Sequence, residues 1–308
     1  MIEVLDVAVI IPSYRDRGHL QALLVALGQQ NPPLREVVVS HSSHPTPELL
    51  SEPPMSPGLP LVFLHSDQRL FSGVARNRGA RRSTASWLAF LDDDVVPARG
   101  WAGELASMLN PGNANRCFVG SLGCSSSGGY WGMSLWFVEF GSVHPYLPSR
   151  SVEAGASANM LVHRELFDRV GGFPEAIERS VDVTFMRECS LRGAEVWVEP
   201  GLRADHHNPR GAAKCLGQAY RIGRSSARVR QRLPLRGGLA VRFPFLAPLL
   251  LPVRMLQLTY RVLRWGRGFR WTFVWHLAGI ALILLSWTWG FTRQAFAGIS
   301  ATSMTVDS

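Results

Sequence analysis

Cysteine is scarce in this sequence of 308 residues, and its four copies show no metal-binding or disulfide-framework spacing. Cys117, Cys124, Cys189 and Cys215 form no CxxC pair. We therefore expect neither a cysteine zinc site nor a disulfide scaffold. A hydrophobic content of 46% is ordinary for a globular protein and excludes disorder over most of the length.

The N-terminus lacks the basic region that begins a signal peptide. Glu3 and Asp6 stand where that region needs positive charge, and the apolar run that follows is short and strand-like. We therefore expect the catalytic part of the chain to remain in the cytoplasm. Internal repeats are also absent, so no solenoid or propeller is predicted.

Acidic residues are missing from the stretch Phe243 to Phe291, which is instead rich in Leu, Trp and Phe. The net charge of +9 comes largely from arginine, and much of it lies after residue 200. Such a basic cluster can bind nucleic acid or anionic lipid headgroups. Because no nucleic-acid motif accompanies it, we predict a membrane partner and no nucleic acid.

Two apolar runs in this region differ in length. Trp271 to Phe291 holds twenty-one residues without charge and has Trp towards its ends, which matches a membrane-crossing helix. The alternative is a buried amphipathic helix, but its polar residues are few. We predict a spanning or re-entrant helix over 271–292 and a flexible tail over 293–308. The earlier run, Phe243 to Val253, is short and broken by prolines, so 226–270 is predicted to be a basic interfacial segment.

The first half of the chain alternates short apolar runs with helical patterns. Strands are expected at residues 7–11, 36–40, 61–64 and 87–91, helices around 20–27 and 73–83, and a loop over 41–60. This alternation is typical of a doubly wound α/β sheet, which binds its ligand at the carboxyl ends of the strands. Further on we expect strands at 160–162 and 195–198 and helices at 164–170 and 181–192.

Asp92, Asp93 and Asp94 follow directly on one of the predicted strands. Three successive carboxylates repel one another unless a cation or several hydrogen-bond donors neutralise them. Because a strand alternates its side chains, Asp92 and Asp94 are expected to point the same way and could share one divalent ion, for which Mg²⁺ or Mn²⁺ is the natural choice. A solvated acidic turn opening the next helix is the alternative.

A basic, glycine-containing helix precedes the acidic strand. The segment Gly73 to Ala80 supplies Arg76, Asn77 and Arg78. Arginine suits the recognition of a pyrophosphate or a base by several hydrogen bonds at once. By itself, such a segment is more often the exposed face of a basic helix.

The order of these motifs resembles the nucleotide-sugar-binding half of family-2-type glycosyltransferases with the GT-A fold. The motifs are Ile10 to Tyr14, Gly73 to Ala80, and Ala89 to Asp94. Gly155 to Met160, Gly171 to Glu175, and Asp182 ahead of Arg187 are similar to the acceptor-side half. The resemblance covers residues 7 to about 225, so 1–225 is predicted to be a GT-A-like catalytic domain with a mixed sheet and helices on both faces.

The resemblance implies a role for each matching position. Pro12, Tyr14, Arg76 and Asn77 would bind the nucleotide or its diphosphate. Asp92, Asp93 and Asp94 would form the Asp-X-Asp motif, with Asp94 on the metal. Asp182 would be the base that deprotonates the acceptor hydroxyl. His206 would join the metal or phosphate shell, with His207 as its close competitor.

Two positions depart from the family pattern. Where the family has an aspartate after the second strand to hold the base, this sequence has Ser40 and His41. Where the family has an acidic pair at the catalytic base, Val181 precedes Asp182. Glu178 and Glu188 are therefore alternative bases, and Asp182 could instead pair or cap within a helix.

These observations predict a metal-dependent, inverting transfer from a nucleoside-diphosphate sugar, with a UDP-sugar as first candidate. The acceptor is expected to be a lipid-linked molecule or a glycan at the cytoplasmic face of the inner membrane, in the synthesis of a cell-envelope polysaccharide or glycolipid. A catalytically silent nucleotide-sugar scaffold and a nucleotidyltransferase are the alternatives.

Overall fold

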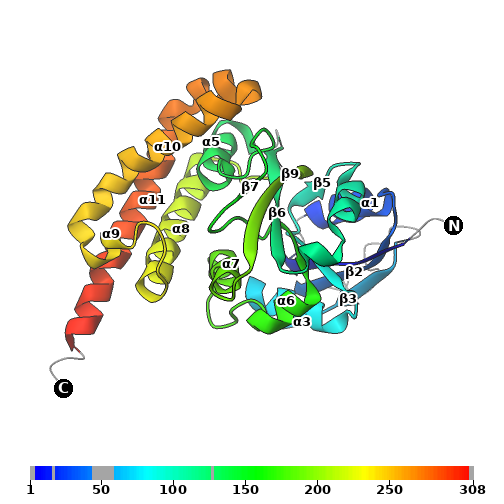
Figure 1. Ribbon diagram of the computed structural model, residues 1–308. Helices are drawn as coiled ribbons and strands as arrows, with labels where there is room; N and C mark the ends of the chain where they lie inside the picture. Colours follow the sequence, from blue (N-terminus) through cyan, green and yellow to red (C-terminus); the bar gives the residue numbers. More distant parts are fainter. Residues whose placement is uncertain (1–3, 16–17, 44–58, 126–127, 305–308) are drawn as a thin grey trace. The chain divides into compact units, whose positions relative to one another are not determined.

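The computed structural model describes residues 4–15, 18–43, 59–125 and 128–304, which form two compact units (Figure 1). Unit 1 comprises Met1–Gly123 and Val143–His207, and unit 2 comprises Cys124–Ser142 and Asn208–Ser308. Unit 2 thus takes in 124–142 and 208–225, which the sequence groups with the catalytic domain.

Unit 1 is built on one mixed nine-stranded sheet with the order β3-β2-β1-β4-β8-β6-β9-β5 and with β7 beside β9. β1 is parallel to β2, β2 to β3, and β1 to β4. The next pairings are antiparallel: β4 with β8, β8 with β6, and β9 with β5 and β7. The strands are β1 (Leu5–Tyr14), β2 (Leu34–Ser42), β3 (Leu61–Leu64), β4 (Trp87–Leu91), β5 (Val95–Pro97), β6 (Arg116–Cys124), β7 (Arg150–Ser151), β8 (Asn159–His163) and β9 (Glu195–His206).

The helices of unit 1 connect these strands. They are α1 (His19–Gly28), α3 (Ser72–Arg82), α4 (Trp101–Met108), the 3-10 turn η1 (Pro111–Asn113), α6 (Arg164–Val170) and α7 (Val181–Leu191). The predicted mixed α/β sheet with helices is therefore confirmed.

The central strand β1 is buried on both faces, as its continuous apolar run predicts. Residues 7–11 have no exposed surface. Helix α3 lies very close to this strand at Gly79, where an added Cβ would come within 2.5 Å of Ile10 Cγ2. Only glycine permits this approach, which fixes the height of α3 above the sheet.

Three features of unit 1 differ from the sequence prediction. Asp92 to Asp94 lie in a turn closed by the Val95 N–H and the Asp92 carbonyl at 3.1 Å, because β4 ends at Leu91. β9 is much longer than predicted and includes His206. The predicted loop over 41–60 is partly strand, since β2 runs to Ser42, and residues 44–58 lie outside the described residues.

Unit 2 is helical. It contains α5 (Gly129–Phe140), α8 (Ala212–Arg232), α9 (Leu239–Arg242), the 3-10 segment η3 (Pro244–Leu249), α10 (Leu250–Trp265), η4 (Arg267–Phe269) and α11 (Arg270–Met304). A separate core cluster holds these helices together, and Trp136, Phe137, Ile283 and Phe291 are among its fully buried members.

Helix α11 continues past residue 292, where the sequence predicts that the apolar helix ends, and its 35 residues include most of the predicted flexible tail. Among the described residues, the segment Arg267–Gly298 is long and apolar enough to cross a membrane by length and composition. One third (33%) of its most apolar window is buried within the protein. Length alone therefore does not distinguish a spanning helix from a core helix.

Candidate functional site

The candidate site lies where β1 and β4 end and where α3 and α7 begin. Two glycines of α3 bring these elements together. Besides Gly79 against Ile10, Gly73 lies so close to the acceptor-side loop that an added Cβ would be 2.4 Å from the Pro174 carbonyl oxygen and 3.4 Å from Val181. Side chains at the start of α3 are thereby held next to the first turn of α7.

Arg76 occupies the centre of this junction. Its side chain is only 4% exposed, forms a short ion pair with Asp92 and stacks over Phe173 at 5.2 Å from the ring centroid. The sequence interpretation places Arg76 on the nucleotide. In the structure its guanidinium pairs with Asp92, and its role on the nucleotide stays a prediction.

Asn77 forms hydrogen bonds to the turn after α6 that the sequence did not predict. Its amide nitrogen donates to the Phe173 carbonyl and to Glu175 Oε1, both at 2.8 Å, and its Oδ1 accepts from the Phe173 N–H at 2.9 Å. These bonds pin the turn after α6 to α3. The hydrogen bond from Asn77 and the neighbouring Arg81 lower the pKa of Glu175. Asn77 is therefore a structural residue of the turn in this structure.

Asp93 and Tyr14 meet at the end of β1. Asp93 is buried, and its Oδ2 accepts a hydrogen bond from the Tyr14 N–H at 3.4 Å. The guanidinium groups of Arg15 and Arg69 each lie 5.1 Å from the centroid of the Tyr14 ring. Pro12, two residues earlier, is half-buried opposite Ser40 of β2. Pro12 and Tyr14 thus lie at the strand end where doubly wound sheets bind ligands.

Asp94 lies beside His206, as a shared ligand site requires. His206 Nε2 is 3.5 Å from Asp94 Oδ1, and the His207 N–H donates to the Asp94 carbonyl at 2.8 Å. The pairing of β5 with β9 produces this contact, since Val95 is opposite His206. The turn thus separates the aspartates: Asp92 pairs with Arg76, and Asp94 joins His206. Strand alternation was the reason to expect that Asp92 and Asp94 share one ion. Because both residues lie in a turn, that reason no longer applies.

His207 and His19 form a second contact at this edge. Their rings stack at 4.4 Å between centroids, with 15° between their planes. Burial, and then the charge of His19, lower the pKa of His207, which keeps its imidazole neutral near pH 7. The sequence analysis missed His19 because a single histidine at a helix start carries no distinguishing signal.

Asp182 stands in the first turn of α7, close enough to Arg76 and Asp92 to feel both charges. Burial raises its pKa above the ordinary value of 3.8, and Asp92 adds to this effect, while the Val183 N–H and Arg76 oppose it. The Val183 N–H lies 2.8 Å from Asp182 Oδ1. A carboxylate with a raised pKa is a better proton acceptor than an ordinary one.

The two alternative bases are already paired elsewhere. Glu178 Oε1 lies 2.8 Å from Arg69 Nη2, and Glu188 forms an ion pair with Arg192 one turn along the same helix. Neither of these ion pairs links Glu178 or Glu188 to Asp92. Among the three acids, the structure therefore favours Asp182.

His41, which stands where the resemblance leads one to expect an aspartate, lies near the end of β2 and is only 1% exposed. Its ring nitrogens lie 3.2 Å from Ser13 Oγ and 3.0 Å from Ser43 Oγ. Its ring also stacks near Phe63 and His65, each at 5.6 Å. To bind a base edge, His41 would have to exchange one of these serine partners.

No group of three or more His, Cys, Asp or Glu side chains that could hold a metal ion occurs in the part of the chain that the structure describes. The pair Asp94 and His206 supplies two ligands. Mg²⁺ and Mn²⁺ commonly take few protein ligands and complete their shell with water and substrate phosphates. The pair therefore fits such an ion when a diphosphate is present.

Comparison with known proteins agrees with this geometry. The model of glycosyl transferase family 2 matches residues 8–171, more than half of the chain. The pre-mycofactocin glycosyltransferase of Mycobacterium tuberculosis is 26% identical over 74% of this chain and 48% of its own length. Glycosyltransferase AglE of Haloferax volcanii is 23% identical over 72% of this chain and 73% of its own. The chain thus spans about half the length of the mycobacterial relative.

Two solved structures share the fold. GalNAc-T7 with UDP, GalNAc and Mn²⁺ aligns with a TM-score of 0.53 and 16% identity over 67% of this chain and 44% of its own. The mannosyltransferase PcManGT of Pyrobaculum calidifontis, with GDP-Man and Mn²⁺, aligns with a TM-score of 0.50 and 19% identity. The alignment covers 97% of this chain and 75% of that protein. The matched family model and the shared fold lead to one conclusion: the chain belongs to glycosyl transferase family 2 and has the GT-A fold.

Proposed function

We propose that the enzyme transfers a sugar from a nucleoside-diphosphate sugar to a membrane-associated acceptor, with inversion at the anomeric carbon. The observation that carries this proposal is the convergence of Asp182, Arg76 and Asp92, with Asp182 half-buried and its pKa raised. A base with a raised pKa next to donor-site carboxylates is what single-displacement transfer requires.

The donor site is proposed to consist of Pro12 and Tyr14 for the nucleotide and of the Asp92 to Asp94 turn for the ribose and diphosphate. Asp94 and His206 would hold the metal ion, and the imidazole ligand favours Mn²⁺ over the harder Mg²⁺. When bound, such an ion neutralises the charge that develops on the departing diphosphate. Solved proteins of this fold in complex with UDP or UDP-GlcNAc support a UDP-sugar as first candidate.

In the proposed transfer step, Asp182 takes up one proton. Its carboxylate accepts the proton of the acceptor hydroxyl while that oxygen bonds to the anomeric carbon. The bond from this carbon to the diphosphate oxygen breaks on the opposite face, so the configuration inverts. Arg76 acts through Asp92 and positions the carboxylate without taking part in proton transfer.

The acceptor is proposed to be lipid-linked or part of a glycan at the cytoplasmic face of the inner membrane. Residues 208–306 contain fifteen Arg and Lys and neither Asp nor Glu, which supports attraction to an anionic membrane surface. The route served would be the synthesis of a cell-envelope polysaccharide or glycolipid.

A donor screen by thermal shift tests the donor site. The full chain in detergent is heated with UDP, GDP and other nucleoside diphosphates, with and without Mn²⁺. We expect stabilisation by one nucleotide that depends on Mn²⁺ and is lost in Asp94→Asn, since a ligand that binds only the folded state raises its stability. Asp168→Asn, an exposed acid on α6, is the matched control. Absence of any metal-dependent shift would refute the proposed site.

A further inference from the structure

Helices α10 and α11 form a hairpin, called here the apolar hairpin, that exposes large hydrophobic side chains along both arms. Figure 1 shows the two helices joined by the short η4 segment. On α10 the exposed residues recur every three or four positions: Val253, Leu256, Tyr260 and Leu263, and Leu249 at the end of η3 precedes them. On α11 they are Trp271, Val274, Trp275, Leu277, Leu282, Leu285, Trp289 and Phe296. Such continuous apolar stripes are unusual on a water-facing surface.

The stripes point away from the core of unit 2. Between them, Leu258 and Val262 of α10 and Ile280 and Ile283 of α11 are buried in the common core cluster. Each helix therefore has one face in the protein and one face outside it. On α11 both of these faces are apolar, so its outer face is suited to contact with an apolar phase and not with water.

The neighbours of α11 are too polar for it to cross a bilayer in this packing. Arg254 of α10 lies 3.9 Å from the centroid of the Trp287 ring, which belongs to the charge-free run. Burial lowers the pKa of Arg254 to about 10, so it stays charged at neutral pH. Charged side chains near the bilayer centre are strongly unfavourable.

Helix α8 adds to this conflict because it packs along the second half of α11. Ser286 Oγ donates to the Leu216 carbonyl at 2.9 Å, and Gly223 lies so close that an added Cβ would be 2.0 Å from the Trp287 carbonyl oxygen. Gln218 of α8 bonds Glu139 of α5 at 2.9 Å. A spanning α11 would carry these polar groups into the hydrocarbon or lose its core contacts.

We infer that the apolar hairpin lies in the plane of the membrane surface, with both stripes in the headgroup and acyl boundary and arginines on anionic lipid headgroups. This inference rests on the proposed membrane association and specifies its mode: the protein lies on the membrane and does not span it.

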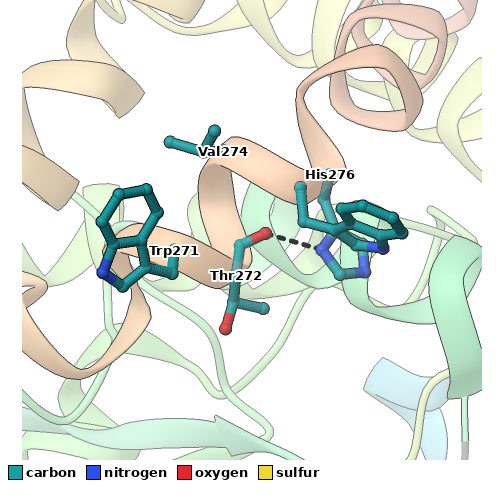
Figure 2. Close-up of a pocket in the computed structure, with 5 residues that line it drawn as sticks. Trp271, Thr272, Val274 and His276 are labelled. Atoms are coloured by element: carbon teal, nitrogen blue, oxygen red, sulfur yellow. Dashed lines mark hydrogen bonds between the residues drawn. The ribbon is translucent and has the colours of Figure 1, made fainter.

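Charge and aromatic placement support an anionic lipid surface as the occupant. Arg264, Arg267 and Arg270 stand exposed at the bend of the hairpin, and the hairpin contains no acidic residue to offset them. At this bend, Trp271 and Trp275 line a hollow with Val274 and with His276, whose Nδ1 bonds the Thr272 carbonyl at 2.6 Å (Figure 2). Tryptophan and arginine together are typical of a membrane interface.

Side-specific labelling distinguishes lying from spanning. Arg267→Cys and Arg293→Cys place thiols at exposed positions at the two ends of the charge-free run. In sealed inside-out membrane vesicles, a membrane-impermeant maleimide should label both variants without detergent, with the wild-type chain as background for its four native cysteines. Labelling of one position only after detergent is added would overturn the in-plane arrangement while leaving membrane association intact.

Vesicle flotation tests the stripes themselves. The purified full chain should float with phosphatidylcholine vesicles containing phosphatidylglycerol and more weakly with phosphatidylcholine alone. The double variant Leu256→Glu and Leu263→Glu should lose about tenfold or more in vesicle affinity, because two apolar contacts with lipid are removed. Leu191→Glu, at an equally exposed leucine (55%) on α7, is the matched control.

Two outcomes would overturn the inference: undiminished flotation of the double variant, or a lipid-free dimer that the double variant abolishes, since the stripes would then bind a second copy. Stabilisation by UDP with Mn²⁺ is read in the same preparations. If a variant that fails to float is still stabilised by UDP with Mn²⁺, its membrane-binding surface is lost while the proposed donor site is intact.

Discussion

The two units differ in which side chains they place against the usual rule: unit 1 buries charged side chains at its site, and unit 2 exposes apolar side chains on the hairpin. At the site of unit 1, charged groups are withdrawn from water and matched with partners: Arg76 is 4% exposed and bonded to Asp92. On the apolar hairpin of unit 2, Trp271 is 85% and Leu256 is 69% exposed, although both are apolar. One unit buries charge and the other exposes hydrophobic surface.

Each exception to the usual distribution lies where we propose that the protein meets a ligand. Buried charges are costly unless paired, so their presence at a strand end indicates a site built for a charged substrate. Exposed apolar stripes are costly in water, so they indicate a surface that is covered by another phase. The comparison predicts that substitutions at the site of unit 1 change the rate of sugar transfer, whereas substitutions on the stripes change the binding of the protein to membranes.

The largest effect is expected for Asp182→Asn. Removing the base should lower kcat/KM by roughly a thousandfold. Binding of the nucleoside diphosphate should be retained, because Asp182 acts on the acceptor. The folded state favours the protonated form of a carboxyl whose pKa is raised, so neutral pH penalises Asp182, and the variant should have a higher Tm near pH 7 than the wild type. Transfer at the wild-type rate would show that another group is the base.

Arg76→Ala tests whether the buried charge of unit 1 depends on its partner. Asp92 would be left without its ion pair, which should destabilise the protein by about 3 kcal/mol in chemical denaturation. Arg76→Ala combined with Asp92→Asn should recover part of that loss, because no unpaired carboxylate remains. A double variant as unstable as the single one would contradict the pairing argument.

Two leucines of α10 provide a matched pair within unit 2. Leu258 is 5% exposed and Leu256 is 69% exposed, although only one residue separates them. Leu258→Ala should cost about 2–4 kcal/mol in the free energy of unfolding, whereas Leu256→Ala should change it by less than about 0.5 kcal/mol. Equal losses measured in detergent-free buffer would mean that Leu256 is covered within the protein.

The smallest effect is a shift along the pH axis. Because burial raises the pKa of Asp182, kcat/KM should rise with pH through a value above 3.8 as the carboxylate forms. Asp182→Glu should keep a rising limb but move its midpoint. A pH profile that is flat in the acidic range would remove Asp182 from the proton transfer step.

Much of unit 1 could be predicted because its strands are short and apolar and alternate with helices along the chain. Residues 7–11, 61–64 and 87–91 lie in the strands expected for them. The runs 7–11 and 87–91 are buried on both faces and therefore apolar throughout, whereas 61–64 is a half-buried strand at the edge of the sheet. The region 120–155 could not be predicted, because α5 is apolar on nearly all sides and is part of the core of unit 2. Its partners are distant in the sequence.

Site residues divide in the same way. The sequence identified Asp94, Asp182 and His206 by motif, and the structure brings Asp94 to His206 and Asp182 towards Arg76. It did not assign the partners of Arg76 and Asn77: Arg76 pairs with Asp92, 16 residues away, and Asn77 bonds the Phe173 carbonyl, 96 residues away. Their donor-binding roles followed from resemblance and stay predictions.

The two glycines of α3 also limit how this enzyme can diversify. Gly79 touches the strand that leads to the proposed donor site, and Gly73 touches the loop that leads to Asp182. No side chain can be added at either position without pushing one half of the chemistry away from the other. Lineages that acquire a new sugar or acceptor should therefore vary in loops around a helix whose position is inherited unchanged.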